Sequence, residues 1–100
     1  MLQVTPHMRI LVAREPLDFR RGIDGTSSTC RQVLLEDPLS GTAFVFRNRS
    51  GTAVRVLVYD GQGFWLMTKR LSKGRFRFWC TPGERGAIVL QPHELVALLA

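Results

Sequence analysis

The residues with the clearest chemical capacity are the basic side chains gathered between Lys69 and Trp79. This segment contains no acidic residue, and its five basic residues are Lys69, Arg70, Lys73, Arg75 and Arg77. An arginine presents a planar fork of N–H donors that matches the oxygens of a phosphate and the edge of a guanine. The chemistry that this segment offers is therefore the binding of a polyanion.

Spacing within the same segment predicts a β-hairpin with its turn at Ser72-Lys73-Gly74. Strict alternation between Arg75 and Trp79 places both arginines and the tryptophan on one face, and the two phenylalanines on the other. A two-stranded ribbon of this kind fits the major groove of DNA, and an exposed Trp79 can lie against bases or sugars. The alternative is a solvated edge whose arginines discourage strand-to-strand aggregation. We predict that this hairpin is the main contact with nucleic acid.

A second basic group lies on the predicted hairpin that precedes this one. Its members are Arg47, Arg49 and Arg55. They extend the same nucleic-acid surface if the strands that carry them are neighbours in one sheet.

A third basic group is the pair Arg20-Arg21, which follows Asp18. We expect Asp18 to cap a helix, and the free N–H groups at a helix start can also receive a phosphate. The alternative is that Asp18 and Asp24 form ion pairs with the two arginines. Phosphate contact at this pair is therefore a secondary prediction.

No residue pattern in the chain indicates catalysis. The eight acidic residues show no spacing that would make them converge on metal ions, as two-metal strand transfer requires. His7 and His93 lack a Ser or Cys motif beside them, and Cys30 and Cys80 form no CxxC pair. Asp60-Gly61-Gln62-Gly63 is followed by a predicted strand, so it is a hairpin turn and not a phosphate-binding loop. We predict a protein without enzymatic activity, metal or cofactor, in which Cys30 is a core residue.

The elements that must position the basic residues follow from the hydrophobic periodicity. Alternating apolar residues predict a first strand from Arg9 to Arg14. Apolar spacing of three to four residues then predicts a helical region from Phe19 to Glu36, divided at Asp24-Gly25 and ended by Pro38.

After Pro38 the pattern changes to short β-rich runs separated by glycine turns. The predicted strands are Ala43 to Arg47, Val54 to Tyr59, Phe64 to Leu71, Arg75 to Trp79, and Ala87 to Leu90. Pro92 fits the first turn of a terminal helix whose apolar side, which includes Leu95, docks on the sheet. The expected fold is a single small α+β domain over residues 1–100. Its sheet is an antiparallel meander, with a helical region after the first strand and a C-terminal helix.

Composition is consistent with one basic domain. The chain has 100 residues, 45% of them hydrophobic, which is enough for one core and leaves no room for a second. The formal net charge is +6 and the sequence pI is about 10.7, so polyanions are the first partners to consider. No stretch approaches a membrane helix and the start lacks a signal-peptide pattern, so we expect a cytoplasmic protein.

Four ordered motifs give the chain a specific resemblance to a known family. They are Asp18 to Gly25, Asp37 to Gly41 leading into Phe44 to Arg49, Tyr59 to Phe64, and Lys69 to Phe76. In this order the motifs resemble those of the TnpB-type, Orf2-like accessory proteins of insertion-sequence family sixty-six. The resemblance covers roughly residues 8 to 99. These proteins are unrelated to the RNA-guided nucleases that share the TnpB name.

The resemblance implies a role in transposition beside a separately encoded transposase of the aspartate-aspartate-glutamate type. It implies no activity for the chain itself. Two hypotheses fit this role. In the first, the chain contacts DNA through its basic surface. In the second, it is a protein-interaction module that docks on the transposase or another element-encoded protein without touching DNA. The sequence leaves the oligomeric state and any preferred DNA sequence open.

Overall fold

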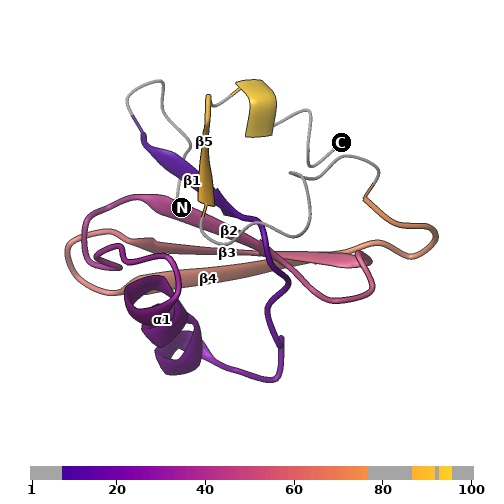
Figure 1. The fold of residues 1–100 in the computed structure, drawn as a ribbon, viewed down its shortest axis with the longest axis horizontal. Helices are drawn as coiled ribbons and strands as arrows, with labels where there is room; N and C mark the ends of the chain where they lie inside the picture. The colour runs from indigo at the N-terminus through magenta and orange to yellow at the C-terminus, as the bar shows by residue number, and fades with distance from the viewer. Residues whose placement is uncertain (1–7, 77–86, 92, 96–100) are drawn as a thin grey trace.

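Five strands and two short helical segments make up the computed structural model, which describes residues 8–76, 87–91 and 93–95 (Figure 1). The elements are β1 (Ile10–Ala13), α1 (Ile23–Gln32), β2 (Ala43–Arg47), β3 (Ala53–Tyr59), β4 (Phe64–Arg70) and β5 (Ala87–Leu90). A helical turn follows at residues 93–95. These five strands lie within one residue of their predicted ends. The part of the predicted terminal helix beyond residue 95 lies outside the described residues. No helix of the described part is long and apolar enough to cross a membrane.

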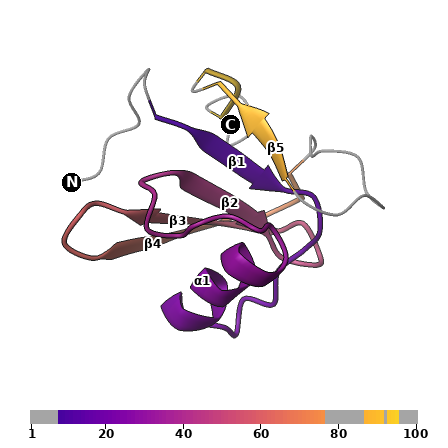
Figure 2. The same cartoon turned by 60° about the vertical axis from the view of Figure 1, so that its left-hand side comes forward.

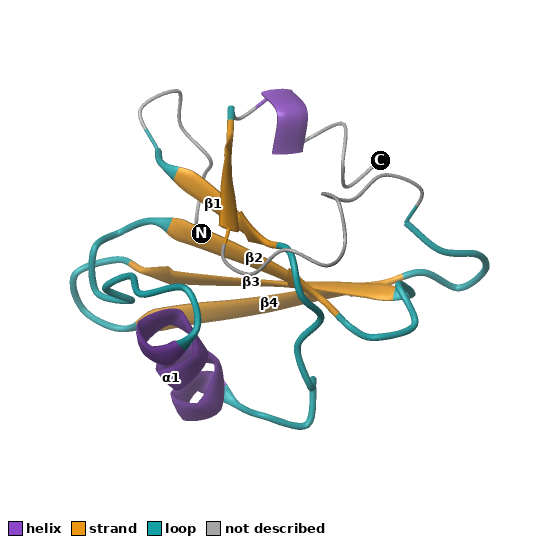
Figure 3. Ribbon diagram, in the orientation of Figure 1, coloured by secondary structure: helices purple, strands orange, loops and turns teal. Residues whose placement is uncertain are grey.

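The sheet is mixed and has the strand order β4-β3-β2-β1-β5 (Figure 3). The antiparallel meander is confirmed for β2, β3 and β4. It is wrong for β1, which pairs parallel with β2 in the register Ile10 to Ala43 and Val12 to Val45. The physical reason is that α1 forms a crossover connection, which carries the chain back so that β2 starts beside the start of β1.

Helix α1 is one continuous helix and is shorter than predicted. It begins at Ile23 after Gly22, which has no side chain to cap it. The prediction that Asp18 is the cap is wrong, and Asp18 accepts hydrogen bonds from Arg20. Gly25 lies inside the helix and does not divide it. A Cβ atom at Gly25 would lie 2.8 Å from the Cβ of Arg21, so close packing accounts for this glycine.

The helix ends at Gln32, four residues before the predicted end at Glu36. Leu35 adopts a left-handed conformation with φ 55°, and the Glu36 N–H donates to the Cys30 carbonyl. This closing turn reverses the chain before the conformational restriction at Pro38 takes effect.

Both faces of the sheet are buried at its centre. Cys30 of α1, Leu17, Phe44 and Leu57 belong to one core cluster, on the face that α1 covers (Figure 2). The cluster on the other face includes Ile10, Val12, Val45, Val58 and Leu95. The prediction that Cys30 is a core residue is confirmed, and burial raises the pKa of its thiol to about 12. Leu95, in the helical turn at residues 93–95, packs in the second cluster, and the rest of the predicted terminal helix lies outside the described residues.

The predicted strand from Arg75 to Trp79 does not form where the structure describes it. Arg75 and Phe76 are not in a strand, and β4 has only β3 as a neighbour among the described residues. The physical reason is that Phe76 N–H donates to the Gly51 carbonyl, 2.9 Å away, in the turn between β2 and β3. Residues 71–76 therefore run toward that turn and do not form a strand along β4. Arg77, Phe78 and Trp79 lie outside the described residues.

Candidate nucleic-acid interface

One end of the sheet collects most of the basic residues singled out in the sequence. Strands β2 and β4 both run antiparallel to β3, so both of them end there. The turn between β2 and β3 and the segment after β4 lie at the same end (Figure 1). We call this group the basic rim, and it consists of Arg47, Arg49, Lys69, Arg70, Lys73 and Arg75.

Hydrogen bonds hold the two halves of the basic rim together. Leu71 N–H donates to the Thr52 carbonyl at 2.9 Å, and Phe76 N–H donates to Gly51. Inside the turn, Asn48 Oδ1 accepts from the Thr52 N–H at 2.9 Å, and Asn48 Nδ2 donates to Thr52 Oγ1 at 3.0 Å. Gly51 supplies the positive φ of 74° that this turn requires. The backbone that carries Arg49 and Arg75 is therefore fixed by short-range and long-range bonds.

The basic rim contains no carboxylate. Between Gly41 and Phe76 the sequence has one acidic residue, Asp60. It lies in the β3–β4 turn at the opposite end of that hairpin, where hydrogen bonds from the Gln62 N–H, the Trp65 indole and the Gly63 N–H lower its pKa. Within the described residues, four cations of the basic rim form no hydrogen bond or ion pair, namely Arg49, Arg70, Lys73 and Arg75. These four keep donors available for an anion.

The basic rim wraps around the end of the sheet and does not lie on one face. Arg47 and Lys69 both flank Val54 in the register, so their side chains leave from the same face. Arg70 pairs with Ala53 and leaves from the opposite face, where α1 lies. Near Arg70, a hollow of about 440 Å³ is lined by Thr52 and Lys73 among others.

Arg55 lies on the neighbouring strand as predicted, but its side chain faces inward. Its Nη1 donates to the Arg21 carbonyl at 2.6 Å, and its Nη2 donates to the Phe19 carbonyl at 3.0 Å. The guanidinium also lies 4.4 Å from the centre of the Phe19 ring. Arg55 thus ties the loop before α1 to the sheet, and partial burial lowers its pKa.

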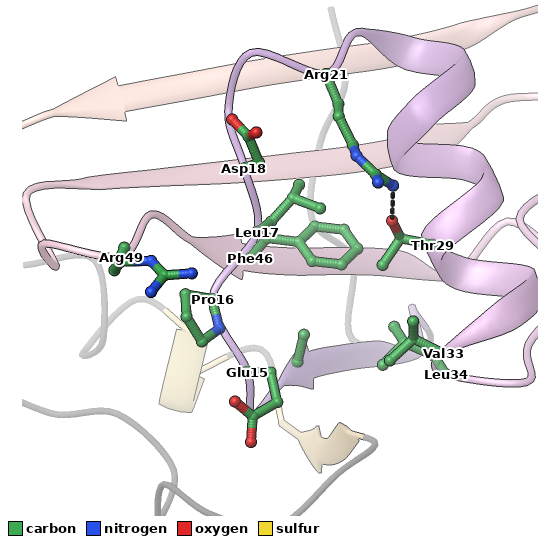
Figure 4. Close-up of a pocket in the computed structure, with 11 residues that line it drawn as sticks. Glu15, Pro16, Leu17, Asp18, Arg21, Thr29, Val33, Leu34, Phe46 and Arg49 are labelled. Atoms are coloured by element: carbon green, nitrogen blue, oxygen red, sulfur yellow. Dashed lines mark hydrogen bonds between the residues drawn. The ribbon is translucent and has the colours of Figure 1, made fainter.

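Arg20 and Arg21 lie near Arg49 of the basic rim. Arg49 and Arg21 both line a hollow of about 300 Å³ between the loop before α1, the end of α1 and β2 (Figure 4). Arg49 and Arg20 line a second hollow of about 650 Å³. The backbone bond from Leu17 N–H to the Arg47 carbonyl, 2.8 Å long, holds this loop against the end of β2.

The alternative expected for these arginines, an ion pair with an aspartate, is present for Arg20. Its Nη2 lies 2.8 Å from Asp18 Oδ2, and hydrogen bonds from Arg20 lower the pKa of Asp18 to about 2. Arg21 instead donates to Thr29 Oγ1 at 3.3 Å. Both arginines are exposed. A phosphate that binds Arg20 would have to compete with Asp18, whereas a phosphate that binds Arg21 would not.

Sequence reasoning missed the residues that shape the basic rim, chiefly Asn48 and Thr52. An Asn four residues before a Thr, with a Gly between them, is the signal that could have indicated a side-chain-bonded turn. The predicted residues Arg77 and Trp79 lie outside the described part of the chain. Within that part, no group of three His, Cys, Asp or Glu side chains could hold a metal ion.

These features define a small, strongly basic domain built on a mixed five-stranded sheet. Residues 8–100 match the model of the IS66 Orf2 like protein family, and the chain belongs to that family. Membership indicates an accessory role in an insertion sequence, in association with transposition, and not a known enzyme.

Two relatives from Sinorhizobium fredii (strain NBRC 101917 / NGR234) are similar over nearly the whole chain. The uncharacterised protein y4jC is 41% identical over 93 residues, which are 93% of this chain and 78% of the relative. The uncharacterised protein y4hO is 41% identical over 100 residues, which are 100% of this chain and 85% of the relative. No solved structure matches the chain.

Proposed function

We propose that this chain is a non-catalytic accessory protein of transposition that contacts duplex DNA through the basic rim and acts beside a separately encoded transposase. The observation that supports the proposal most is the convergence of six cations, from two strand ends and two loops, at one end of the sheet. Phosphates are spaced along both strands of a duplex, so a fixed cluster of this kind can contact several at once.

The availability of the cations supports DNA over a purely structural role for the basic rim. Arg49, Arg70, Lys73 and Arg75 are exposed and have no ion-pair partner among the described residues. Each phosphate that such a side chain neutralises releases counterions. For about four contacts, the slope of log affinity against log salt is expected to be roughly −4. Arg20 and Arg21 extend the proposed contact past Arg49.

The test is the salt dependence of binding to a generic duplex, measured by fluorescence anisotropy. Lys73→Ala combined with Arg75→Ala removes two cations from the segment after β4 without altering a strand. We expect this double variant to flatten the slope by about 2, because two phosphate contacts are lost. Circular dichroism should show an unchanged fold.

The matched control is Arg9→Ala combined with Arg31→Ala, which removes the same charge elsewhere. Arg9 precedes β1 and pairs with Glu36 at the end of the sheet opposite the basic rim, and Arg31 is exposed on α1. The control should keep a slope close to that of the unaltered chain. Equal losses in both double variants would mean that only net charge matters.

The second candidate function is docking on the transposase or another element-encoded protein. Trp65 and Met67, 40% and 38% exposed on the edge strand β4, favour a protein contact in addition to DNA. If the unaltered chain shows no duplex binding at low salt, the DNA proposal is abandoned and this function takes its place.

A further inference from the structure

Strand β4 forms an edge of the sheet that is long and regular. Its pairing with β3 runs without interruption from Tyr59 with Phe64 to Ala53 with Arg70. The strand contains no proline and no bulge, which are two of the features that commonly block an edge against further pairing. In the described part of the chain its other side has no strand partner.

The bonds at the two ends of β4 show which of its peptide groups face outward. Leu71 N–H donates toward β3, to Thr52, and the Gly63 carbonyl accepts from Asp60. Bonding to a neighbour alternates along an antiparallel strand, so the odd-numbered residues of β4 bond to β3. The peptide groups that face outward belong to the even-numbered residues, which are Phe64, Leu66, Thr68 and Arg70.

The order of side chains along β4 makes the strand complementary to itself. The aromatic residues Phe64 and Trp65 stand at one end, the cations Lys69 and Arg70 stand at the other, and Met67 stands at the centre. We propose that two copies of this chain pair antiparallel through β4, about a two-fold axis at Met67, to form one continuous sheet.

In this register all seven residues of β4 are paired. Each outward peptide group meets an outward group of the second copy, because even-numbered residues face even-numbered ones. Phe64 lies opposite Arg70, and Leu66 lies opposite Thr68. Trp65 opposite Lys69 and Met67 opposite Met67 form the closer, non-hydrogen-bonded pairs.

The positions of the charged residues along β4 favour this arrangement. Each cation of one copy faces an aromatic ring of the other, which is a favourable cation–π geometry. A parallel pairing in the same register would instead place the cations of both copies together, and like charges directly opposite destabilise a sheet. Shifting the antiparallel register by two residues in either direction removes the contacts between rings and cations. In the paired arrangement the second copy covers the exposed Trp65 and Met67 side chains.

Pairing also sets the position of the two basic rims. They lie at opposite ends of the joined strands, with the Arg70 Cα atoms about 20 Å apart along the strand direction, since six residues separate them at about 3.4 Å each. Dimerisation itself does not depend on DNA, so the tests below are made without it. Their failure would leave the DNA proposal standing.

The first test is sedimentation equilibrium on the chain and on two charged variants of Met67. The unaltered chain should show a dimer that dissociates on dilution. Met67→Lys and Met67→Glu should each weaken association at least tenfold, because like charges meet at the axis. Since Met67 is 38% exposed, neither change should unfold the domain, as circular dichroism would verify. An equal mixture of the two variants should recover the dimer, because Lys then faces Glu.

The second test is cross-linking through a single cysteine in a Cys80→Ser background, with Cys30 buried. Met67→Cys should form a covalent dimer under mild oxidation, because Cα atoms in a non-hydrogen-bonded pair are about 4.5 Å apart. The control Lys69→Cys should not, because its two copies would lie about 14 Å apart. Three results would overturn the proposal: a monomer at every concentration, a charged mixture that fails to associate, or equal cross-linking at both positions.

Discussion

Arg55 is a basic residue that stabilises the fold and does not contribute its donors to the exposed basic surface. In the sequence it resembles Arg47 and Arg49, which lie in the same predicted hairpin. In the structure its donors are taken by the carbonyls of Phe19 and Arg21. The alternation of apolar residues predicts the strand that carries Arg55. It does not predict that the Arg55 guanidinium donates to carbonyls of a loop that is distant in the sequence.

Replacing Arg55 by lysine should therefore lower stability. A lysine keeps the charge but cannot reach two carbonyls as a planar fork. We expect the free energy of unfolding to fall by about 1–3 kcal/mol, the range for hydrogen bonds made by charged groups. Urea denaturation followed by tryptophan fluorescence measures this change. Arg49→Lys is the control and should leave the midpoint unchanged, and a similar loss in both variants would contradict the role given to Arg55.

The pairing of Asp18 with Arg20 could be foreseen at the residue scale, because the two lie two positions apart. Their proximity follows from the local chain alone. The position of Arg49 beside Arg20 and Arg21 could not be foreseen. It depends on the backbone bond between Leu17 and Arg47, which joins segments 30 residues apart.

Among the elements, the end of α1 holds a conformation that its sequence does not favour. Leu35 has φ 55° and is 81% exposed, so no burial of its side chain offsets the cost of the left-handed backbone. Glycine is the common residue at this position of a helix end. The helix end was predicted too late for this reason, since no glycine marks it.

Leu35→Gly should stabilise the protein. Glycine removes the steric cost of the left-handed conformation. Part of this gain in stability is lost, because glycine also gives the unfolded chain greater conformational freedom. We expect a net increase of about 0.5–1 kcal/mol in the free energy of unfolding, measured by thermal and urea denaturation. Val33→Gly, where the backbone is right-handed, should instead lower stability by a similar amount.

Strand positions were predictable from the sequence because alternation and glycine turns are local signals. The predicted bounds of β2 and β5 agree with the structure, and those of β3 and β4 differ by one residue. The direction of β1 was not predictable, because alternation is the same for parallel and antiparallel pairing. The path after β4 was not predictable either, because Gly51 and Thr52 of another turn take the backbone bonds of Phe76 and Leu71.

At the scale of the whole molecule, the helical turn at residues 93–95 adds Leu95 to the core on the face that α1 leaves uncovered. Leu95 is 3% exposed and packs in the cluster that holds Ile10 and Val12. Leu95→Ala should lower the free energy of unfolding by about 2–4 kcal/mol, the range for truncating a buried leucine. Urea denaturation measures the loss. Leu39→Ala, at a residue that is 47% exposed, should cost much less, and equal costs would show that Leu95 is not a core residue.

The place of β1 in the sheet has a consequence for how the protein is made. Ile10 is translated near the beginning, yet its partner on one side, Leu90, is translated 80 residues later. Until then the nascent chain holds a four-residue apolar strand with an open edge, while β2, β3 and β4 can already assemble. We therefore expect folding to be completed only after β5 has emerged from the ribosome, and until then the open edge of β1 is exposed to pairing with other chains.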